Sequence, residues 1–172
     1  MYKNFSSVNK TLWIVLVLIL NLTFFSCKKE VESPLTPIET ALDSFVSTLV
    51  STPPTAADLS DRIKNYMMSQ PKTFYGSTVA LLDNAGKVTI SPYWYRSNNT
   101  LLFTELTADT TYHINTLTWL RTPIDGGKAI WTAPYFDAGG GNIWMRTRSV
   151  PVYVNGKIIA IATTDMEVAN PN

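Results

Sequence analysis

The chain has 172 residues, with 14 basic and 13 acidic side chains, one cysteine and one histidine. This length fits one domain with an anchor, while a single cysteine and a single histidine exclude a disulfide framework and multi-thiolate or multi-histidine metal sites. A net charge near zero argues against a nucleic-acid partner, because phosphate binding requires a concentrated basic surface.

The first 26 residues predict a lipoprotein signal peptide. A basic start precedes the apolar run Leu12–Leu20, which is too short to span a membrane, since a span takes about 20 residues. Cys27 follows, and residues 22–27 resemble a bacterial lipobox, whose cysteine carries the lipid once the signal is cut. We therefore predict removal of residues 1–26 and lipidation of Cys27. A plain signal peptide or signal anchor with an incidental cysteine is the alternative.

Lipidation would attach the protein to the cell envelope, and by analogy with other lipoproteins to the outer membrane. Removal of residues 1–26 takes away two basic side chains and no acidic ones, so the mature chain has 12 bases, 13 acids and a net charge of −1. Residues 27–36 comprise the lipidated cysteine and a polar segment that is predicted to tether the following domain.

Residues 37–70 have the apolar spacing of helices. Thr36–Glu39 is a capping box with proline at the first helical position. Apolar residues then recur every three to four positions in two stretches, which Pro53 and Pro54 separate, and Pro71 ends the second stretch. The sequence predicts two helices here, or one long helix that is broken.

Residues 77–95 have the pattern of a β-hairpin. Ser77–Leu82 is a predicted strand, the turn Asp83–Gly86 follows, and Lys87–Ser91 returns as its partner and runs on toward Tyr95. Further along, residues 112–122 predict a short helix and residues 129–131 a short strand.

The last third of the chain predicts a long hairpin. Two strands, Asn142–Val154 and Lys157–Asp165, flank Asn155-Gly156, which is a strong signal for a type I′ turn. Helices followed by a mostly antiparallel sheet indicate an α+β fold.

The sequence offers little to support an enzyme. The lone His113 has no nucleophile motif beside it, and neither G-x-S-x-G nor a P-loop occurs. The glycine triplet Gly139–Gly141 is interpreted as a turn rather than a phosphate cradle, because no helix with a lysine follows it. We therefore predict no catalytic activity, no cofactor and no metal.

Three segments resemble the Cache family of extracytoplasmic sensor domains, which share a PAS-like fold. They are Trp131-Thr132-Ala133-Pro134-Tyr135-Phe136-Asp137, Thr147-Arg148-Ser149-Val150-Pro151-Val152 and the final strand Ala160–Met166. The resemblance covers residues 37–168 and leaves residues 169–172 as a tail. It implies helices packed on a central antiparallel sheet, with a pocket for a small molecule such as an amino acid, a carboxylate or an amine on the other face.

The resemblance also implies where ligand contacts lie. The aspartate at the end of the last strand, Asp165, would point into the pocket, and aromatic walls would come from Trp119, Tyr93 and Tyr95. The amino-acid-binding subgroup has an arginine two residues before this tryptophan and a tyrosine just after it. This chain has leucines at both places, which argues against an α-amino acid as the ligand.

The chemistry of the side chains suggests further contacts. Asp165 or Asp137 could pair a ligand cation beside aromatic faces, and Arg121 or Arg146 could pair a carboxylate. Structural alternatives are open for several of them: tryptophan and tyrosine at 131 and 135 as core residues, and Asp137 as a cap of the glycine turn. The candidate ligand-binding residues are Tyr93, Tyr95, Trp119, Arg121, Trp131, Tyr135, Asp137 and Asp165.

These observations predict a lipid-anchored extracytoplasmic sensor or binding domain for a small molecule. Because the chain ends a few residues after the domain, we expect it to act through a separate envelope protein. The alternative is a structural or docking lipoprotein that has the same fold and binds no ligand.

Overall fold

The computed structural model describes residues 36–98 and 100–171. The predicted signal peptide, Cys27 and nearly all of the tether lie outside these ranges. Within them, none of the helices is both long enough and apolar enough to cross a membrane.

Two amphipathic helices open the described part of the chain. Helix α2 spans Thr36–Ser51 and helix α3 spans Leu59–Ser69, so the prediction of two helices separated at the proline pair is confirmed. The ring of Phe45 stacks on that of Tyr66, with centroids 4.5 Å apart, and joins the two helices. Their other buried apolar side chains are Ile38, Leu42, Leu49, Leu59, Ile63 and Met67.

An antiparallel sheet follows, with strand order β4-β3-β1-β8-β7-β5; β2 pairs with β1, and β6 pairs with β7. The long hairpin of β7 and β8 turns at Asn155 and Gly156, which both have positive φ, as a type I′ turn requires. The strands are β1 Gly76–Leu82, β2 Val88–Ile90, β3 Pro92–Ser97, β4 Thr100–Glu105, β5 Ile130–Trp131, β6 Tyr135–Phe136, β7 Trp144–Val154 and β8 Lys157–Glu167.

The segment between β4 and β5 differs from the prediction of a helix over residues 112–122. Three 3-10 turns come first, η1 Leu106–Ala108, η2 Thr110–Tyr112 and η3 Ile114–Thr116, and helix α4 then spans Thr118–Gly126. Side-chain caps hold the first two turns; for example, the Asp109 carboxylate accepts from the backbone and the hydroxyl of Thr111. Such local bonds compete with a continuous helix.

The strand predictions also need two corrections. The strand predicted to run from Lys87 toward Tyr95 is divided at Ser91: β2 ends at Ile90, and β3 begins at Pro92. Strands β4 and β6 were not predicted at all. Strand β4 is an edge strand with half-exposed and exposed side chains, and β6 has two residues, so neither carries a clear alternation of apolar and polar positions.

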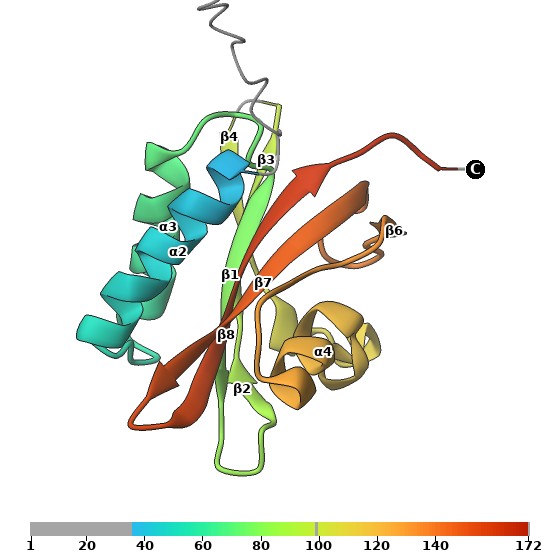
Figure 1. The fold of residues 1–172 in the computed structure, drawn as a ribbon. Coiled ribbons are helices and arrows are strands. Elements are labelled where there is room, and N and C mark those ends of the chain that lie inside the picture. Colours follow the sequence, from blue (N-terminus) through green and yellow to red (C-terminus); the bar gives the residue numbers. More distant parts are fainter. Residues whose placement is uncertain (1–35, 99, 172) are drawn as a thin grey trace, which may run out of the picture. The chain divides into compact units, whose positions relative to one another are not determined.

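The sheet separates two layers, which confirms the α+β, PAS-like arrangement (Figure 1). Helices α2 and α3 cover one face and pack on Val79, Val150 and Val152, whereas α4 and the 3-10 turns cover the other. Strand β8 packs against both layers, since Ala160 and Ala162 face α2 and α3 while Ile161 faces α4. Fully burying one large apolar side chain, such as that of Ile161, stabilises the fold by about 1.5–3 kcal/mol.

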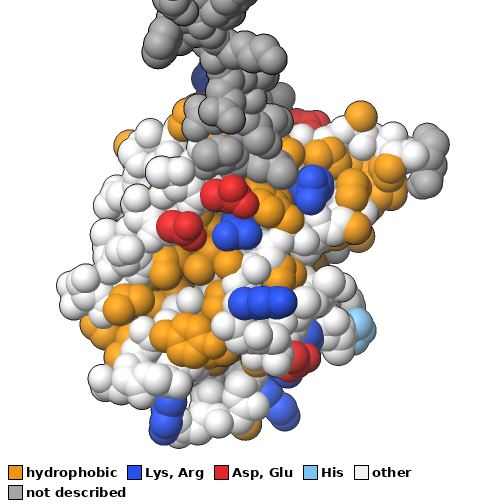
Figure 2. Space-filling model, in the orientation of Figure 1, with side chains coloured by type: hydrophobic (Ala, Val, Ile, Leu, Met, Phe, Trp, Pro, Cys, Tyr) orange, Lys and Arg blue, Asp and Glu red, His pale blue; other side chains and the backbone are white. Residues whose placement is uncertain are grey.

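Acidic and basic side chains are interspersed among apolar ones on the face of the molecule drawn in Figure 2. This face carries no continuous basic surface of the kind that nucleic-acid binding uses.

Candidate functional site

A small buried cavity lies on the face of the sheet that α4 and the 3-10 turns cover. Its volume is about 10 Å³, which is room for about one water molecule. Its walls come from β1, β3, β6, β7, β8, the turns, α4 and the segment after β6. The lining residues are Thr78, Tyr93, Leu106, Tyr112, Trp119, Tyr135, Asp137, Thr147, Thr163 and Asp165.

Five of the eight candidate residues from the sequence meet at this cavity: Tyr93, Trp119, Tyr135, Asp137 and Asp165. They are spread over more than 70 positions of the chain (165 − 93 = 72), and the fold brings them together. Two acidic side chains and three aromatic rings therefore share one enclosed space.

The other three candidates lie elsewhere. Tyr95 stacks behind Tyr93, with ring centroids 5.3 Å apart, and does not line the cavity. Arg121 donates to the Gly86 carbonyl at 3.3 Å and pairs with Asp125 on the same helix, so its guanidinium lies at the outer surface.

Trp131 lies on the opposite face of the sheet, against α2. Its indole N–H donates to Glu39 Oε1 at 2.9 Å, and the Arg146 guanidinium lies over its ring at 5.5 Å. Trp131 and Arg146 are therefore separated from the cavity by the sheet and do not contact a molecule held there. The open alternative of a core role for Trp131 matches this placement.

Asp165 is the more enclosed of the two acidic residues of the cavity, with 4% of its surface exposed. The Thr147 hydroxyl on the paired strand donates to its Oδ1 at 2.7 Å. Burial raises the pKa of the Asp165 carboxyl to about 7. The hydrogen bond from Thr147 and the nearby Tyr93 hydroxyl oppose the rise, and the nearby Asp137 carboxylate adds to it.

Asp137 both shapes a turn and faces the cavity. Its Oδ2 accepts from the Gly141 backbone N–H at 2.9 Å, and its Oδ1 accepts from the Tyr112 hydroxyl at 2.8 Å. Burial raises the pKa of Asp137, although both hydrogen bonds lower it. Gly140 is required beside it, because a Cβ there would lie 2.0 Å from Asp137 Oδ2.

The tyrosines of the cavity stay neutral. Burial raises the pKa of Tyr93, Tyr112 and Tyr135, and the two carboxylates raise it further. The Tyr135 hydroxyl shares a hydrogen bond of 2.8 Å with Thr147. The Tyr93 hydroxyl lies near the Asp165 carboxyl, which adds to the rise of its pKa, but it makes no hydrogen bond of regular geometry among the described residues.

Sequence reasoning missed half of the lining. Thr147 stands in a quoted family segment and alternates with the other buried residues of β7, a signal that could have identified it. Tyr112 gave no such signal, because it lies in a 3-10 turn without periodicity. The other missed residues are Thr78, Leu106 and Thr163.

A second hollow of about 200 Å³ adjoins the cavity and shares Trp119 and Tyr135 with it. Its other walls are Leu117 and Thr118 before and at the start of α4 and the segment Thr132–Pro134. These two aromatic side chains therefore form the partition between an outer apolar hollow and the inner acidic cavity.

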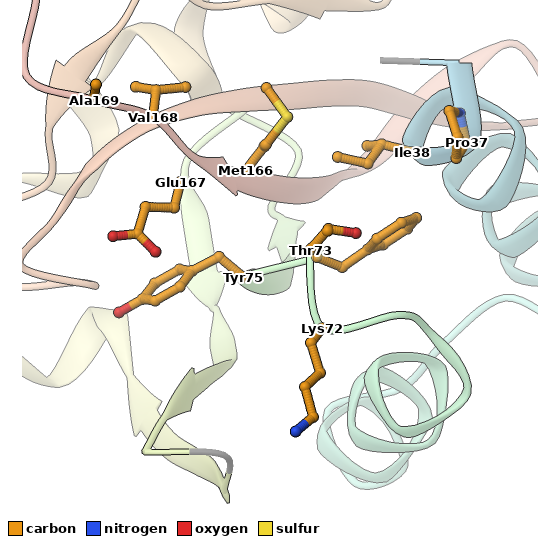
Figure 3. A pocket seen from close by; sticks show the side chains of 10 residues that line it. Pro37, Ile38, Lys72, Thr73, Tyr75, Met166, Glu167, Val168 and Ala169 are labelled. Carbon is orange, nitrogen blue, oxygen red and sulfur yellow. The ribbon is translucent and has the colours of Figure 1, made fainter. Parts of the chain in front are cut away.

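A larger groove of about 680 Å³ lies where α2 begins and β8 ends (Figure 3). Its charged side chains, Lys72 and Glu167, are exposed, and Tyr75 lies beside Glu167 in the view. Open water screens such charges, whereas burial at Asp165 strongly perturbs the pKa of the carboxyl. Clusters of perturbed groups mark functional sites, so the small cavity is the better candidate despite its volume.

No cluster of three or more histidine, cysteine or acidic side chains able to hold a metal occurs in residues 36–98 and 100–171.

Comparison with known proteins gives a consistent picture. The sequence profile of the methyl-accepting chemotaxis protein-like, first PDC sensor domain matches residues 59–170. Among curated proteins, none matches the chain at a significant level.

Solved structures share the fold. The extracellular domain of soHK1S-Z6, assigned as a histidine kinase, is 25% identical with a TM-score of 0.67, over 77% of this chain and 53% of that one. The ligand-binding domain of the Campylobacter jejuni chemoreceptor Tlp3 with L-valine is 17% identical (TM-score 0.58, 77% and 52%). The ligand-binding domain of the Pseudomonas aeruginosa chemoreceptor PctC with GABA is 21% identical, with a TM-score of 0.53, over 77% of this chain and 56% of that one. The chain thus spans about half the length of these chains.

Proposed function

Because the chain belongs to the family of methyl-accepting chemotaxis protein-like, first PDC sensor domains, we propose that it is an extracytoplasmic sensor of a small molecule. The family membership confirms the resemblance to Cache-type sensor domains that the sequence suggested. The observation that carries the proposal is the buried cavity, in which two acidic side chains and four aromatic rings converge from separate parts of the chain.

The lining favours a cationic ligand. None of the ten lining residues is lysine, arginine or histidine, whereas Asp137 and Asp165 are both acidic. Aromatic faces beside a carboxylate attract ammonium groups. L-Valine and GABA, bound by the related Tlp3 and PctC domains, both contain an amino group. Without a basic side chain to pair a carboxylate, an amine suits this cavity better than an amino acid.

Binding requires the cavity to open. Ligand pockets typically enclose about 300–1,000 Å³, far above the volume found here. Rotation of Trp119 or Tyr135 would join the inner cavity to the outer hollow of about 200 Å³. We therefore expect the ammonium group to lie near Asp165 and an apolar remainder to occupy the outer hollow.

A thermal-shift screen of the full-length chain in detergent micelles tests this function. Small amines should raise the melting temperature, because a molecule that binds only the native state stabilises it. Asp165→Asn should abolish the rise, and Asp43→Asn, on the exposed side of α2, should leave it unchanged. If no amine or carboxylate in the library changes the melting temperature of the wild type or of Asp43→Asn, the sensor proposal is overturned.

Attachment to the membrane through Cys27 is the second part of the proposal, and it rests on the lipobox-like residues 22–27. Cys27→Ser should abolish metabolic labelling with a radioactive fatty acid and release the protein from the membrane fraction. Unchanged labelling of the serine variant would refute lipidation at this cysteine. Density-gradient separation of the two membranes tests the outer-membrane location.

A separate envelope protein is proposed to read the bound state. The part of the chain that the structure describes has no membrane-spanning helix to carry a signal inward. Ligand-dependent cross-linking in intact cells, lost in Asp165→Asn, would support such a partner.

The small volume of the buried cavity favours a second candidate function. A cavity of about 10 Å³ that its own side chains almost fill suits a docking module that has lost its ligand. The two functions differ in one result: a docking module shows partner binding that no small amine changes.

A further inference from the structure

The Asp165 carboxyl has fewer hydrogen-bond donors than the other buried carboxyl of the cavity. Among the described residues it accepts one hydrogen bond, from the Thr147 hydroxyl. Asp137 accepts two, from the Tyr112 hydroxyl and the Gly141 backbone. Because hydrogen bonds to the charged form stabilise a buried carboxylate, Asp137 holds a negative charge more readily than Asp165.

The groups that face Asp165 bring no positive charge. Asp137 lines the same cavity, and β1, β7 and α4 present Thr78, Thr147 and Trp119, which do not titrate near neutral pH. Two carboxylates in one enclosed space repel, so they disfavour charge on both at once. The remaining titratable neighbours are all tyrosines, from the segment before β1, from α3, β3, η2 and β6: Tyr75, Tyr66, Tyr93, Tyr112 and Tyr135.

A neutral Asp165 fits its surroundings. A protonated carboxyl has one O–H donor, which needs an acceptor when it is buried. The Tyr93 hydroxyl is buried nearby with no other partner in the described ranges, and it can accept. Neutral Asp165 can therefore donate to the Tyr93 hydroxyl, and a charged Asp165 could accept from it, so this hydroxyl accommodates either form. The second carboxyl, Asp137, and the lack of a cation in the lining are what disfavour the charged form.

We infer that Asp165 carries a proton in the ligand-free protein near neutral pH, and that the cavity takes up a cation in exchange for this proton. The inference rests on the proposed function, in which a small amine binds. In the exchange the O–H bond of Asp165 breaks, the proton passes to bulk water, and the remaining carboxylate pairs with the incoming ammonium. One positive charge enters and one leaves, so the exchange leaves the net charge of the cavity unchanged.

Ligand affinity should consequently depend on pH. The pKa of Asp165 is raised to about 7, mainly by burial. Below that pH the cation must displace the proton, and above it the carboxylate is already charged. The affinity for an alkylammonium ion should rise about tenfold per pH unit toward pH 7 and level off above it.

Infrared spectroscopy of the full-length chain in detergent micelles tests the proton without any ligand. The C=O stretch of a protonated carboxyl should be present below about pH 7 and disappear above it. This band should be absent from Asp165→Asn and intact in Asp43→Asn. Thr147→Val, which removes the donor to the carboxylate, should move the midpoint to higher pH. Identical spectra of the wild type and Asp165→Asn would overturn the inference.

Isothermal titration with primary alkylammonium ions over the same pH range tests the exchange. Proton release appears as a dependence of the measured heat on the ionisation enthalpy of the buffer. An affinity that is independent of pH, or binding without proton release, would overturn the exchange. If no alkylammonium ion binds at any pH, the proposed function fails. The infrared spectra still show whether Asp165 carries a proton.

Discussion

The Tyr112 hydroxyl donates to the Asp137 carboxyl at 2.8 Å and so ties the 3-10 turns to the segment that enters β7. Both residues are buried, and both line the cavity. This bond fixes one wall of the cavity, because the turns carry Leu106 and lead into α4, which carries Trp119. The integrity of the site therefore depends on a contact between two segments that are themselves short and irregular.

Tyr112→Phe should destabilise the fold. The substitution keeps the ring and removes one of two donors to a buried carboxyl, which costs about 1.5–3 kcal/mol. Chemical denaturation measures the change in the free energy of unfolding. The matched control is Tyr153→Phe, which loses a bond from an exposed hydroxyl to the Gly127 carbonyl and should cost about 1 kcal/mol or less. Equal losses would contradict the structural role of Tyr112.

Gly140→Ala should disturb the Asp137 turn. The added Cβ would lie 2.0 Å from Asp137 Oδ2 and 3.2 Å from the Tyr112 hydroxyl, so the carboxyl must move. Overpacking of this kind costs about 1–3 kcal/mol. Gly126→Ala, whose Cβ would meet nothing nearer than 4.0 Å, serves as the control and should be nearly neutral. A melting temperature unaffected by Gly140→Ala would argue against close packing here.

Trp131 should couple energetically to Glu39 rather than to the cavity. A double-mutant cycle with Trp131→Phe and Glu39→Ala should give a coupling free energy of about 1 kcal/mol, because the indole N–H donates to the carboxylate. Glu39→Gln keeps an acceptor and should retain most of that coupling. Additive effects of the two single changes would contradict the hydrogen bond between α2 and the sheet.

The stability of the ligand-free chain should fall as pH rises from about 4 to about 7. The folded-state pKa of Asp165 is about 7, above its usual value of 3.8, so the folded state binds a proton that the unfolded state has already lost. The stabilisation from that proton is complete below pH 4 and gone above pH 7, on the order of 4 kcal/mol in total.

Urea denaturation at a series of pH values measures this slope. Asp165→Asn, which resembles the protonated carboxyl, should remove it and should be more stable than the wild type above about pH 7. A wild-type slope of the opposite sign, or one that the asparagine variant retains, would show that Asp165 is charged in the fold.

The large elements of the fold could be predicted from the sequence because each has its own local signal. Helical spacing with prolines at the ends marked α2 and α3, and Asn155-Gly156 marked the β7–β8 hairpin. The same signals failed for β4 and for the 3-10 turns. The edge strand β4 is held by its pairing with β3, and the first two turns are held by side-chain caps; neither feature gives a periodic pattern in the sequence.

The candidate site was predicted in part for a related reason. Tyr135, Asp137 and Asp165 stand in segments that resemble a known family, and the resemblance also implied Tyr93 and Trp119, whereas nothing in the sequence indicated Tyr112. Trp131 lies in the same quoted segment as Tyr135, and the sequence did not distinguish the face of the sheet that each would occupy. Trp131 pairs with Arg148 beside α2, while Tyr135 pairs with Met145 and lies against Thr147 in the cavity.

Helices before a mostly antiparallel sheet, the hairpin turn, and acidic and aromatic residues suited to a small-ligand pocket all follow from the amino-acid sequence. Which groups each of them faces depends on how the strands pair and pack. The pairing that starts at Val154 and Lys157 would, if continued, oppose Asp165 to Arg146, because the paired residue numbers sum to 311. An irregularity at Val152 and Tyr153 shifts the register by one residue, so Asp165 meets Thr147 and Arg146 meets Met166. One extra residue in a strand thus decides whether the buried carboxyl has a cation or a hydroxyl beside it.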